Sequence, residues 1–299
     1  MTTAPNDVEE YDQSKFWVAP ARNFRSSARL HLQHYLMQNT LGYLLEPAVE
    51  KSVVSSQQLK IADLACGNGI WLTELYSSLS KSGISAQLDG FDINPTNFPD
   101  PFYLPASVTL KELDILKKPI PAELIGIYDV VHIRAFVSVI PDSNLTPLLS
   151  VVSELLKPGG FLQWEETRGD RFIVESPSPH ISKVACDTII QVLKEGQQAR
   201  GIRNDWVDEL DQYLDRYGFQ GARLRVHEKR KQDFKGWTED YLMVWEDLAI
   251  FFPPKSKEPS APLSREAWID MFANSVTETE QGVVIHQGKV MTAVGQKPL

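Results

Sequence analysis

The sequence predicts an α/β fold in which a parallel sheet is covered by helices on both faces, and two observations carry this prediction. Short apolar runs typical of buried strands alternate, over residues 57–170, with helical segments or longer crossovers. In addition, a Gly-rich turn at residues 65–69 joins the first of these strands to the first helix after it. The 42 % of apolar and 23 % of charged residues are typical of an ordinary globular protein.

Five strands are expected in this part of the chain. They cover residues 59–65, 86–92, 108–114, 127–133 and 160–166. The apolar spacing predicts helices over 70–80 and 144–156, and the second should end at the Pro-Gly-Gly sequence of residues 158–160.

A further helix is expected over residues 27–46, with Ser26 or Ser27 as its cap and Pro47 as its stop. Leucine and methionine side chains recur there at steps of three and four residues, and His34 falls in the same stripe. Spacing alone favours a hydrogen-bonded core histidine.

After residue 170 the pattern loosens. Helices are expected over 178–200, 205–217, 238–252 and 264–275, and strands over 223–231 and 283–294. Two stretches, 171–200 and 236–281, are long insertions, and several tryptophan, tyrosine and phenylalanine residues lie in this part of the chain. They would fit a cap over a hydrophobic small molecule or the interface of a homodimer equally well.

The charge balance argues against several classes of partner. The chain has 30 Lys and Arg against 39 Asp and Glu, a net charge of −9, whereas a nucleic-acid surface needs a basic face. Basic side chains alternate over Arg223–Lys229, but Glu228 interrupts them, and we interpret them as a solvated face. We therefore expect no nucleic-acid partner.

Location and metal content are also constrained. The two cysteines, Cys66 and Cys186, do not supply a disulfide framework, and no metal-ligand spacing is present, so no metal is expected. No secretory signal and no apolar run of about 20 residues is visible. We expect a cytoplasmic protein that does not bind membranes.

The first turn carries the clearest chemical signal. The small residues Ala65, Gly67 and Gly69 would let a ligand approach the backbone, where the next helix presents free N–H groups. A dinucleotide fold holds a pyrophosphate at this turn. Here Asp63 would repel a pyrophosphate but could pair with an ammonium group, which favours a nucleotide that carries an amino acid over NAD.

Two further acids end the next strands. Asp92 should end the second strand, where a carboxylate accepts hydrogen bonds from a ribose diol. Asp114 should end the third, where it could accept from an adenine amino group while Leu113 and Ile115 pack on the ring. Each acid singly would be read as a surface or capping residue, but three at successive strand ends form a pattern.

In order along the chain, the segments DLACGNG, GFDIN, LDIL, YDVVHIRAF and LLKPGGFLQWEE resemble class I S-adenosylmethionine-dependent methyltransferases. The upstream RLHLQHYLMQNTLGYLLEP resembles the leading helix of fungal secondary-metabolite methyltransferases, the group that contains the sirodesmin- and gliotoxin-pathway enzymes. The resemblance covers residues 27–170 well and the C-terminal third loosely. Ala65 departs from it, because the family usually has glycine there.

This resemblance implies a doubly wound, Rossmann-like sheet of seven strands, mostly parallel, with an antiparallel C-terminal strand. It implies a flexible tail over 1–26 and one domain over 27–299. That domain would comprise a lid helix (27–56), a cofactor-binding core (57–170) and the cap insertions (171–200 and 236–281). The implied cofactor is S-adenosyl-L-methionine, with S-adenosyl-L-homocysteine as product.

Further cofactor contacts follow from the resemblance. Ile93 is expected beside Asp92 at the ribose, and Arg134 at the end of the fourth strand. Arg29, Gln33 and His34 would form a lid over the carboxylate of the cofactor, which favours a site role for His34 over the core reading.

Methyl transfer needs the nucleophile, methyl carbon and sulfur held in line, and base catalysis is optional. Strand alternation puts His132 on the same face as Arg134, and Asp129 is expected nearby. His132 is a base by chemical type, or it only contacts the methionine part of the cofactor. Glu166 is a second acid or base candidate, unless one carboxylate of the Glu165-Glu166 pair serves to orient Arg134.

The sequence therefore predicts methyl transfer from S-adenosylmethionine to an O or N atom of a small, largely apolar natural-product intermediate. Two alternatives stay open. One is a methyltransferase-fold cyclase or pericyclase that uses the cofactor structurally, and the other is a regulatory protein of the same fold that acts through a protein partner.

Overall fold

The computed structural model describes residues 24–54, 56, 58–140, 143–199 and 201–299. Most of the expected flexible tail, residues 1–23, lies outside this set. Helix α1 (Phe24–Leu41) begins three residues earlier than residue 27, so the tail prediction is wrong for residues 24–26.

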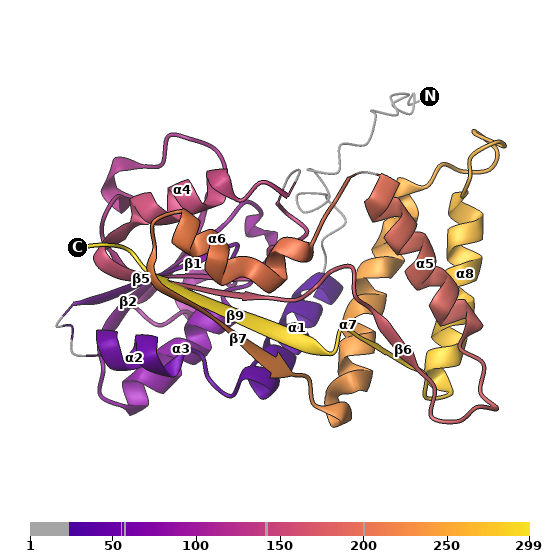
Figure 1. Ribbon diagram of the computed structural model, residues 1–299, viewed down its shortest axis with the longest axis horizontal. Helices are drawn as coiled ribbons and strands as arrows, with labels where there is room; N and C mark the ends of the chain where they lie inside the picture. Colours follow the sequence, from indigo (N-terminus) through magenta and orange to yellow (C-terminus); the bar gives the residue numbers. More distant parts are fainter. Residues whose placement is uncertain (1–23, 55, 57, 141–142, 200) are drawn as a thin grey trace.

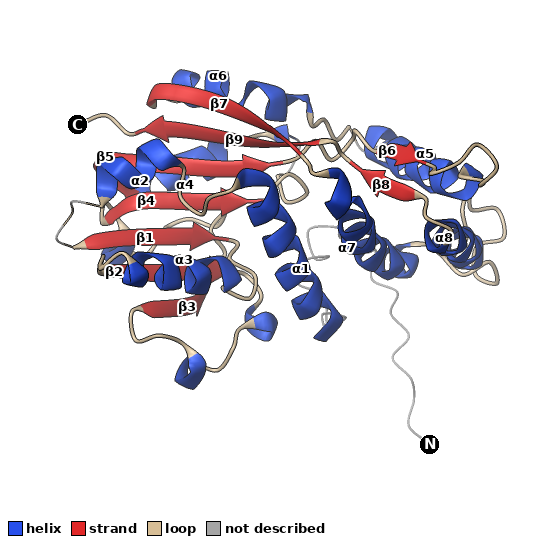
Figure 2. Cartoon of the chain, turned by 90° about the horizontal axis from the view of Figure 1, so that it is seen from below, coloured by secondary structure: helices blue, strands red, loops and turns tan. Residues whose placement is uncertain are grey.

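A seven-stranded sheet forms the centre of the molecule, in the order β3-β2-β1-β4-β5-β9-β7 (Figure 2). Its strands are β1 (Leu59–Leu64), β2 (Ala86–Asp92), β3 (Val108–Glu112), β4 (Tyr128–Arg134), β5 (Leu156–Glu166), β7 (Gln220–Glu228) and β9 (Lys289–Gln296). The pairs from β3 to β5 are parallel, and β9 is antiparallel to both β5 and β7. The predicted fold class is confirmed, including the antiparallel C-terminal strand.

The strands are apolar on both sides because both faces of the sheet are buried. Ile61 of β1 packs in one core cluster with Leu72 of α3 (Ile70–Lys81), whereas Leu64 packs in the other with Leu148 of α4 (Thr146–Leu155). A continuous apolar strand between two helical layers is the pattern of a parallel sheet.

The helix expected over residues 27–46 is two shorter elements. Helix α1 ends at Leu41, and Gly42 follows with φ +79°, a conformation that suits glycine. Helix α2 (Pro47–Val53) begins at the proline expected to be a stop, because proline at the first helical position loses no hydrogen bond. Glu46 caps it by accepting from the backbone N–H groups of Ala48 and Val49.

The strand expected over 283–294 is interrupted at Gly288, which has φ +76°. The first part, β8 (Val284–His286), leaves the large sheet and pairs with β6 (Ile173–Glu175), which the sequence did not predict. This small sheet packs with α5 (Val184–Ala199), α7 (Phe234–Asp247) and α8 (Arg265–Glu280). Figure 1 shows these elements beside the large sheet, and we call them the cap.

The cap comprises α5, α7, α8, β6 and β8, and its core contains Trp237, Tyr241, Trp245 and Trp268 beside aliphatic side chains. Helix α6 (Leu210–Arg216) instead packs on β7 and β9 of the large sheet. Among the residues that the structure describes, no helix is long and apolar enough to cross a bilayer.

Candidate functional site

The turn after β1 has three residues in the left-handed region. Ala65, Gly67 and Gly69 have φ of +56°, +60° and +74°. A Cβ on Gly69 would lie 2.7 Å from Cδ1 of Leu110, so a larger residue would displace that side chain and would also be strained at φ +74°. Ala65 tolerates the conformation, but an L-residue with a Cβ adopts it at a cost of about 1–2 kcal/mol. The departure from glycine at Ala65 is therefore a point of backbone strain.

Asp92 ends β2, as predicted, and lies against this turn. Its side chain is largely buried, and Oδ2 accepts a hydrogen bond of 2.8 Å from the backbone N–H of Gly67. Its Oδ1 accepts from the N–H of Asn94 at 2.9 Å. The next residue, Ile93, is 40 % exposed. The end of β2 thus presents an oriented carboxylate beside an open apolar side chain.

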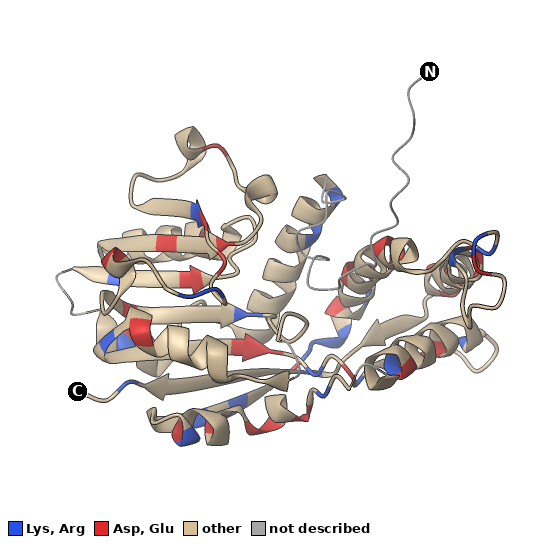
Figure 3. Cartoon of the chain, turned by 90° about the horizontal axis from the view of Figure 1, so that it is seen from above, with Lys and Arg blue, Asp and Glu red and all other residues tan. Residues whose placement is uncertain are grey.

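Asp114 lies two residues beyond β3 and accepts from the N–H of Leu116 at 3.0 Å. The loop is tied to the Asp92 region, because the N–H of Leu113 donates to the carbonyl of Asp92 at 2.9 Å. Ile115 is buried in the hydrophobic core, so the structure does not bear out its predicted packing on a ligand ring. Asp63 and Asp92 lie at neighbouring strand ends, whereas Asp114 lies beyond the end of β3 and not at its last residue, and Figure 3 shows acidic residues at several strand tips.

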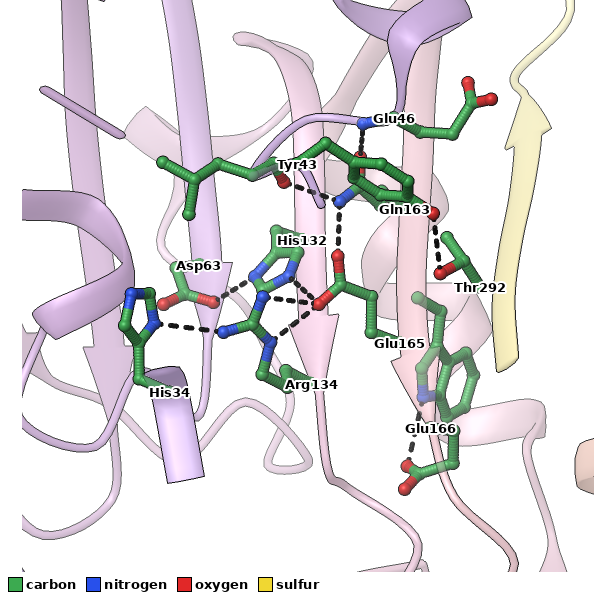
Figure 4. A network of polar contacts seen from close by, with 12 residues as sticks. His34, Tyr43, Glu46, Asp63, His132, Arg134, Gln163, Glu165, Glu166 and Thr292 are labelled. Atoms are coloured by element: carbon green, nitrogen blue, oxygen red, sulfur yellow. Dashed lines mark hydrogen bonds and ion pairs between the residues drawn. The ribbon is translucent and has the colours of Figure 1, made fainter. Parts of the chain in front are cut away.

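A buried polar network crosses the ends of β1, β4 and β5 (Figure 4). Nδ1 of His132 lies 2.7 Å from Oδ1 of Asp63, and its Nε2 lies 3.5 Å from Oε2 of Glu165. The same Glu165 oxygen accepts from Nε of Arg134 at 2.6 Å. Nη1 of Arg134 lies 3.1 Å from Nδ1 of His34, which reaches in from α1. The sequence predicted most members of this network, although not their mutual contacts.

The network sets carboxylates against basic side chains, and each shifts the pKa of the other. Burial alone would lower the pKa of His132, but Asp63 and Glu165 outweigh it and raise that pKa above its usual value. Burial would raise the pKa of Glu165, yet Arg134 and His132 lower it to about 2. Two carboxylates therefore face one guanidinium and one imidazole that favours its charged form.

His34 remains neutral in this setting. Burial, together with the adjacent Arg134, lowers its pKa to about 3. Because its Nδ1 accepts from Arg134, its Nε2 carries the proton and is a donor. Within the described part of the chain, this buried Nε2 has no hydrogen-bond partner. The network thus ends in a donor that lacks an acceptor.

The structure changes the expected role of His132. Its side chain is fully buried, and its ring stacks on Trp71 with centroids 3.7 Å and planes 3° apart. Both ring nitrogens face carboxylates. The residue is therefore the centre of a charge network and not a base that touches an acceptor.

Glu166 also differs from the prediction. Its Oε2 accepts from the N–H groups of Phe136 and Val137 at 2.7 and 2.8 Å, on the face of the sheet opposite the network. Burial raises its pKa to about 7, against the lowering effect of its N–H donors. It anchors the loop after β4, whereas Glu165 is the carboxylate that orients Arg134. In the β4–β5 register Glu165 lies opposite Arg134, and this pairing identifies Glu165 as the partner of Arg134.

Sequence reasoning missed a second buried connection to this network. Nε2 of Gln163 donates to Oε1 of Glu165 at 2.7 Å and to the carbonyl of Leu44 at 2.9 Å. Its Oε1 accepts from the N–H of Glu46 at 2.7 Å. The amide of Gln163 thus fixes the segment between α1 and α2 against β5.

The basic stripe over residues 223–229 is only in part the solvated face that was expected, because Arg225 is 50 % exposed but other members are paired or buried. Arg223 and Arg225 pair with the two carboxylate oxygens of Glu46 at 2.7 and 3.0 Å. Lys229 is 5 % exposed and lies over the ring of Trp237. The stripe packs against the protein at both of its ends.

Two other predictions need correction. Arg29 does not reach the network: its Nη1 lies 3.4 Å from Oδ1 of Asp240 in α7. Asp129 lies at the opposite edge of the sheet, where it accepts from the N–H of Lys60 and pairs with Lys157. Asp129 is the second residue of β4, and only the later residues of a parallel strand reach the carboxyl edge.

The strand order, the antiparallel β9 and the Gly-rich turn after β1 together define the fold of class I S-adenosylmethionine-dependent methyltransferases. No family model matches the chain. The chain is 29 % identical over 202 residues to methyltransferase grgD of a Penicillium species, and the aligned region covers 66 % of each protein. It is 28 % identical over 165 residues to N-methyltransferase verN of Clonostachys rogersoniana, which covers 55 % of each.

These relatives confirm the expected resemblance to fungal methyltransferases. The chain spans about half to two thirds of the length of the relatives that it matches. Among solved structures, the chain is similar to the plantazolicin methyltransferase BpumL, solved with a desmethyl-plantazolicin analogue and S-adenosylhomocysteine. The TM-score is 0.51, the identity is 12 %, and the match covers 96 % of this chain and 95 % of that one. This likeness concerns the fold.

Proposed function

We propose that this chain binds S-adenosylmethionine at the carboxyl edge of its sheet and transfers the methyl group to an N or O atom of a small, largely apolar molecule. The observation that carries the proposal is the ordered set at neighbouring strand ends: the left-handed turn after β1, Asp92 at the end of β2, and the Arg134–His34 pair.

The residues present fit this cofactor. The turn bears no side chain at Gly67 and Gly69, where a ligand needs close approach to the backbone. The protonated Nε2 of His34 is a buried donor that lacks an acceptor among the described residues, and a carboxylate would supply one. A charged, amino-acid-bearing nucleoside offers this group together with the ribose diol that suits Asp92.

Each part of the cofactor then has its own residues. Arg134 and His34 would hold the carboxylate, and Asp63 the ammonium group. Asp92 would hold the ribose hydroxyls. Asp114 would accept from the adenine amino group, with Ile93 as an apolar neighbour.

The bound cofactor supplies an electrophilic methyl group on a sulfonium. The protein's contribution is orientation, because an in-line displacement gains most from fixed geometry. Glu165 holds the Arg134 guanidinium, and Glu166 holds the loop after β4, so the groups around the reacting centre have set positions. With His132 buried, acceptors that need little help with proton loss, such as amines and phenols, suit this site.

The cap favours an apolar acceptor. Phe172 packs edge-on against Tyr241 and Trp245 of α7, with ring centroids 5.2 and 5.3 Å apart. These rings belong to the packed core of the cap, and an apolar element beside the proposed cofactor site suits an aromatic or otherwise apolar acceptor. Two of the relatives are named N-methyltransferases, which supports nitrogen as the first acceptor atom to test.

The test is transfer of label from methyl-labelled S-adenosylmethionine to a panel of aromatic amines, secondary amines and phenols. We expect label in at least one apolar product, and at least tenfold less with Glu165→Gln. A panel member converted to an unlabelled product would contradict methyl transfer and favour the cyclase alternative.

A further inference from the structure

Helix α1 lies between the carboxyl edge of the sheet and the cap helix α7, and Figure 2 shows this placement. On one side it contacts the cofactor edge. His34 meets Arg134 at 3.1 Å, and Asn68 of the turn meets Nδ1 of His31 at 2.9 Å. A Cβ on Gly67 would lie 3.0 Å from Cδ1 of Leu30, so α1 packs directly on the glycine turn.

On its other side α1 meets one buried carboxylate of the cap. Asp240 is 1 % exposed, and each of its oxygens takes one side chain of α1. Oδ1 lies 3.4 Å from Nη1 of Arg29, and Oδ2 accepts from Nε2 of Gln33 at 3.3 Å. The backbone of α7 packs directly on a side chain of α1 here, because a Cβ on Gly236 would lie 2.9 Å from Cδ2 of Leu36.

Asp240 is in turn fixed to the cap through its own helix. Oγ1 of Thr238 accepts from the N–H of Ile285 in β8 at 2.7 Å and lies 3.1 Å from the carbonyl of the same residue. The indole N–H of Trp268 in α8 donates to the carbonyl of Trp245 at 3.1 Å. Movement of the cap therefore moves the carboxylate that holds Arg29 and Gln33.

We propose that Asp240 is a positioning residue for the cofactor site, which sets the placement of α1 and links the cap to cofactor binding. This inference rests on the proposed function. The link is reciprocal by thermodynamic necessity: if the cap position changes cofactor affinity, the cofactor changes the cap to the same extent. An acceptor that favours the same position of the cap as the cofactor would then bind more tightly to the cofactor-loaded protein.

The test measures S-adenosylhomocysteine binding by calorimetry for the wild type, Asp240→Asn and Glu246→Gln. Glu246 is a matched control, since it also joins α7 to α1, through Arg25, but both side chains are more than half exposed. We expect Asp240→Asn to raise Kd about tenfold, within the usual range of coupling between sites. Glu246→Gln should change it less than twofold.

Hydrogen exchange supplies a readout that a merely structural role would not move. S-adenosylhomocysteine should protect amides of α7 in the wild type, and this protection should vanish in Asp240→Asn while that of the Gly67 turn remains. If Asp240→Asn does not fold, Gln33→Leu removes half of the contact and should raise Kd about threefold, again with loss of α7 protection.

Three outcomes are distinguishable. Tight binding by the wild type with equal affinity in Asp240→Asn, or in Gln33→Leu if that variant is used, would overturn the positioning role alone. Protection of α7 that persists in the variant would do the same. A wild type that does not bind S-adenosylhomocysteine would overturn the proposed function itself.

Discussion

Oε2 of Glu165 lies 2.6 Å from Nε of Arg134, and these two residues face each other in the β4–β5 register. Both belong to the carboxyl ends of parallel strands, where neighbouring side chains on one face meet. Glu165 also accepts from Gln163 through its other oxygen. One buried carboxylate therefore organises the guanidinium, the imidazole of His132 and the segment before α2.

Replacing Glu165 by Gln should cost about 3 kcal/mol of unfolding free energy, because it leaves Arg134 buried without its charge partner. Cofactor affinity should fall at least tenfold. Denaturant unfolding and calorimetry with S-adenosylhomocysteine measure the two effects. Glu175→Gln is the control: this carboxylate pairs with His286 but is about half exposed, so less than about 1 kcal/mol is expected. An unchanged affinity in Glu165→Gln would contradict the role of the network.

Ala65→Gly should stabilise the protein by about 1 kcal/mol, because glycine removes the left-handed strain that alanine bears at φ +56°. Ala62→Gly, in the buried strand β1, provides the opposite case and should destabilise by about 1 kcal/mol. Urea unfolding of both variants measures these changes in the free energy of unfolding. A loss of stability in Ala65→Gly would show that the turn is not strained.

The pH dependence of the free energy of unfolding should reveal the titration of the Glu166 carboxyl group. Its pKa is raised to about 7 in the folded protein, so folding takes up a proton between pH 4.5 and 7, and stability falls as the pH rises through this range. In Glu166→Gln this dependence is absent. The stability difference between wild type and variant should therefore be about 2 kcal/mol larger at pH 5 than at pH 8.

The difference measurement removes an opposing effect. The pKa of His34 is lowered to about 3, so its contribution is lost as the pH falls below the unfolded value of 6.5. That loss is the same in both proteins. A gap that stays constant or widens toward pH 8 would count against the buried, proton-binding carboxylate.

Glu46 should contribute more to the free energy of unfolding than its distance from the cofactor edge suggests. It is fully buried, caps α2 and pairs with Arg223 and Arg225 of β7. Glu46→Ala should cost about 1–2 kcal/mol, chiefly from the lost helix cap, because Arg223 and Arg225 are 36 % and 50 % exposed and stay solvated without their partner. Glu228→Gln, which breaks an exposed pair on the same strand, should cost under about 1 kcal/mol in the same thermal or denaturant scan. Equal losses would contradict this account.

Local sequence was enough to predict the sheet core and the turn. The strands at 59–64 and 86–92 and the helix at 70–81 follow from apolar runs, a Gly-rich turn and helical spacing, all within a few residues. The neighbourhood of Asp92 and Gly67 follows as well, because successive parallel strands end at one edge.

Other features depend on contacts that local patterns do not encode. Which of Glu165 and Glu166 faces Arg134 depends on the β4–β5 register, which contains an irregularity between Tyr128 and Val130. Arg29 and its partner Asp240 are 211 residues apart in the sequence, so no local pattern pairs them. A polar side chain on an otherwise apolar helix face suggested a ligand contact instead. The β6–β8 pair is short and consists of three residues a strand, below what alternation can signal.

The most direct test of the central claim is the affinity of S-adenosylhomocysteine for the wild type, Asp92→Asn and Asp129→Asn. Both substitutions neutralise a carboxylate that accepts a backbone N–H, but Asp92 lies at the carboxyl edge and Asp129 at the opposite edge. We predict binding by the wild type, a loss of at least tenfold in Asp92→Asn and less than a twofold change in Asp129→Asn. No binding by the wild type, or equal affinity in Asp92→Asn, would contradict a cofactor site at the carboxyl edge of this sheet.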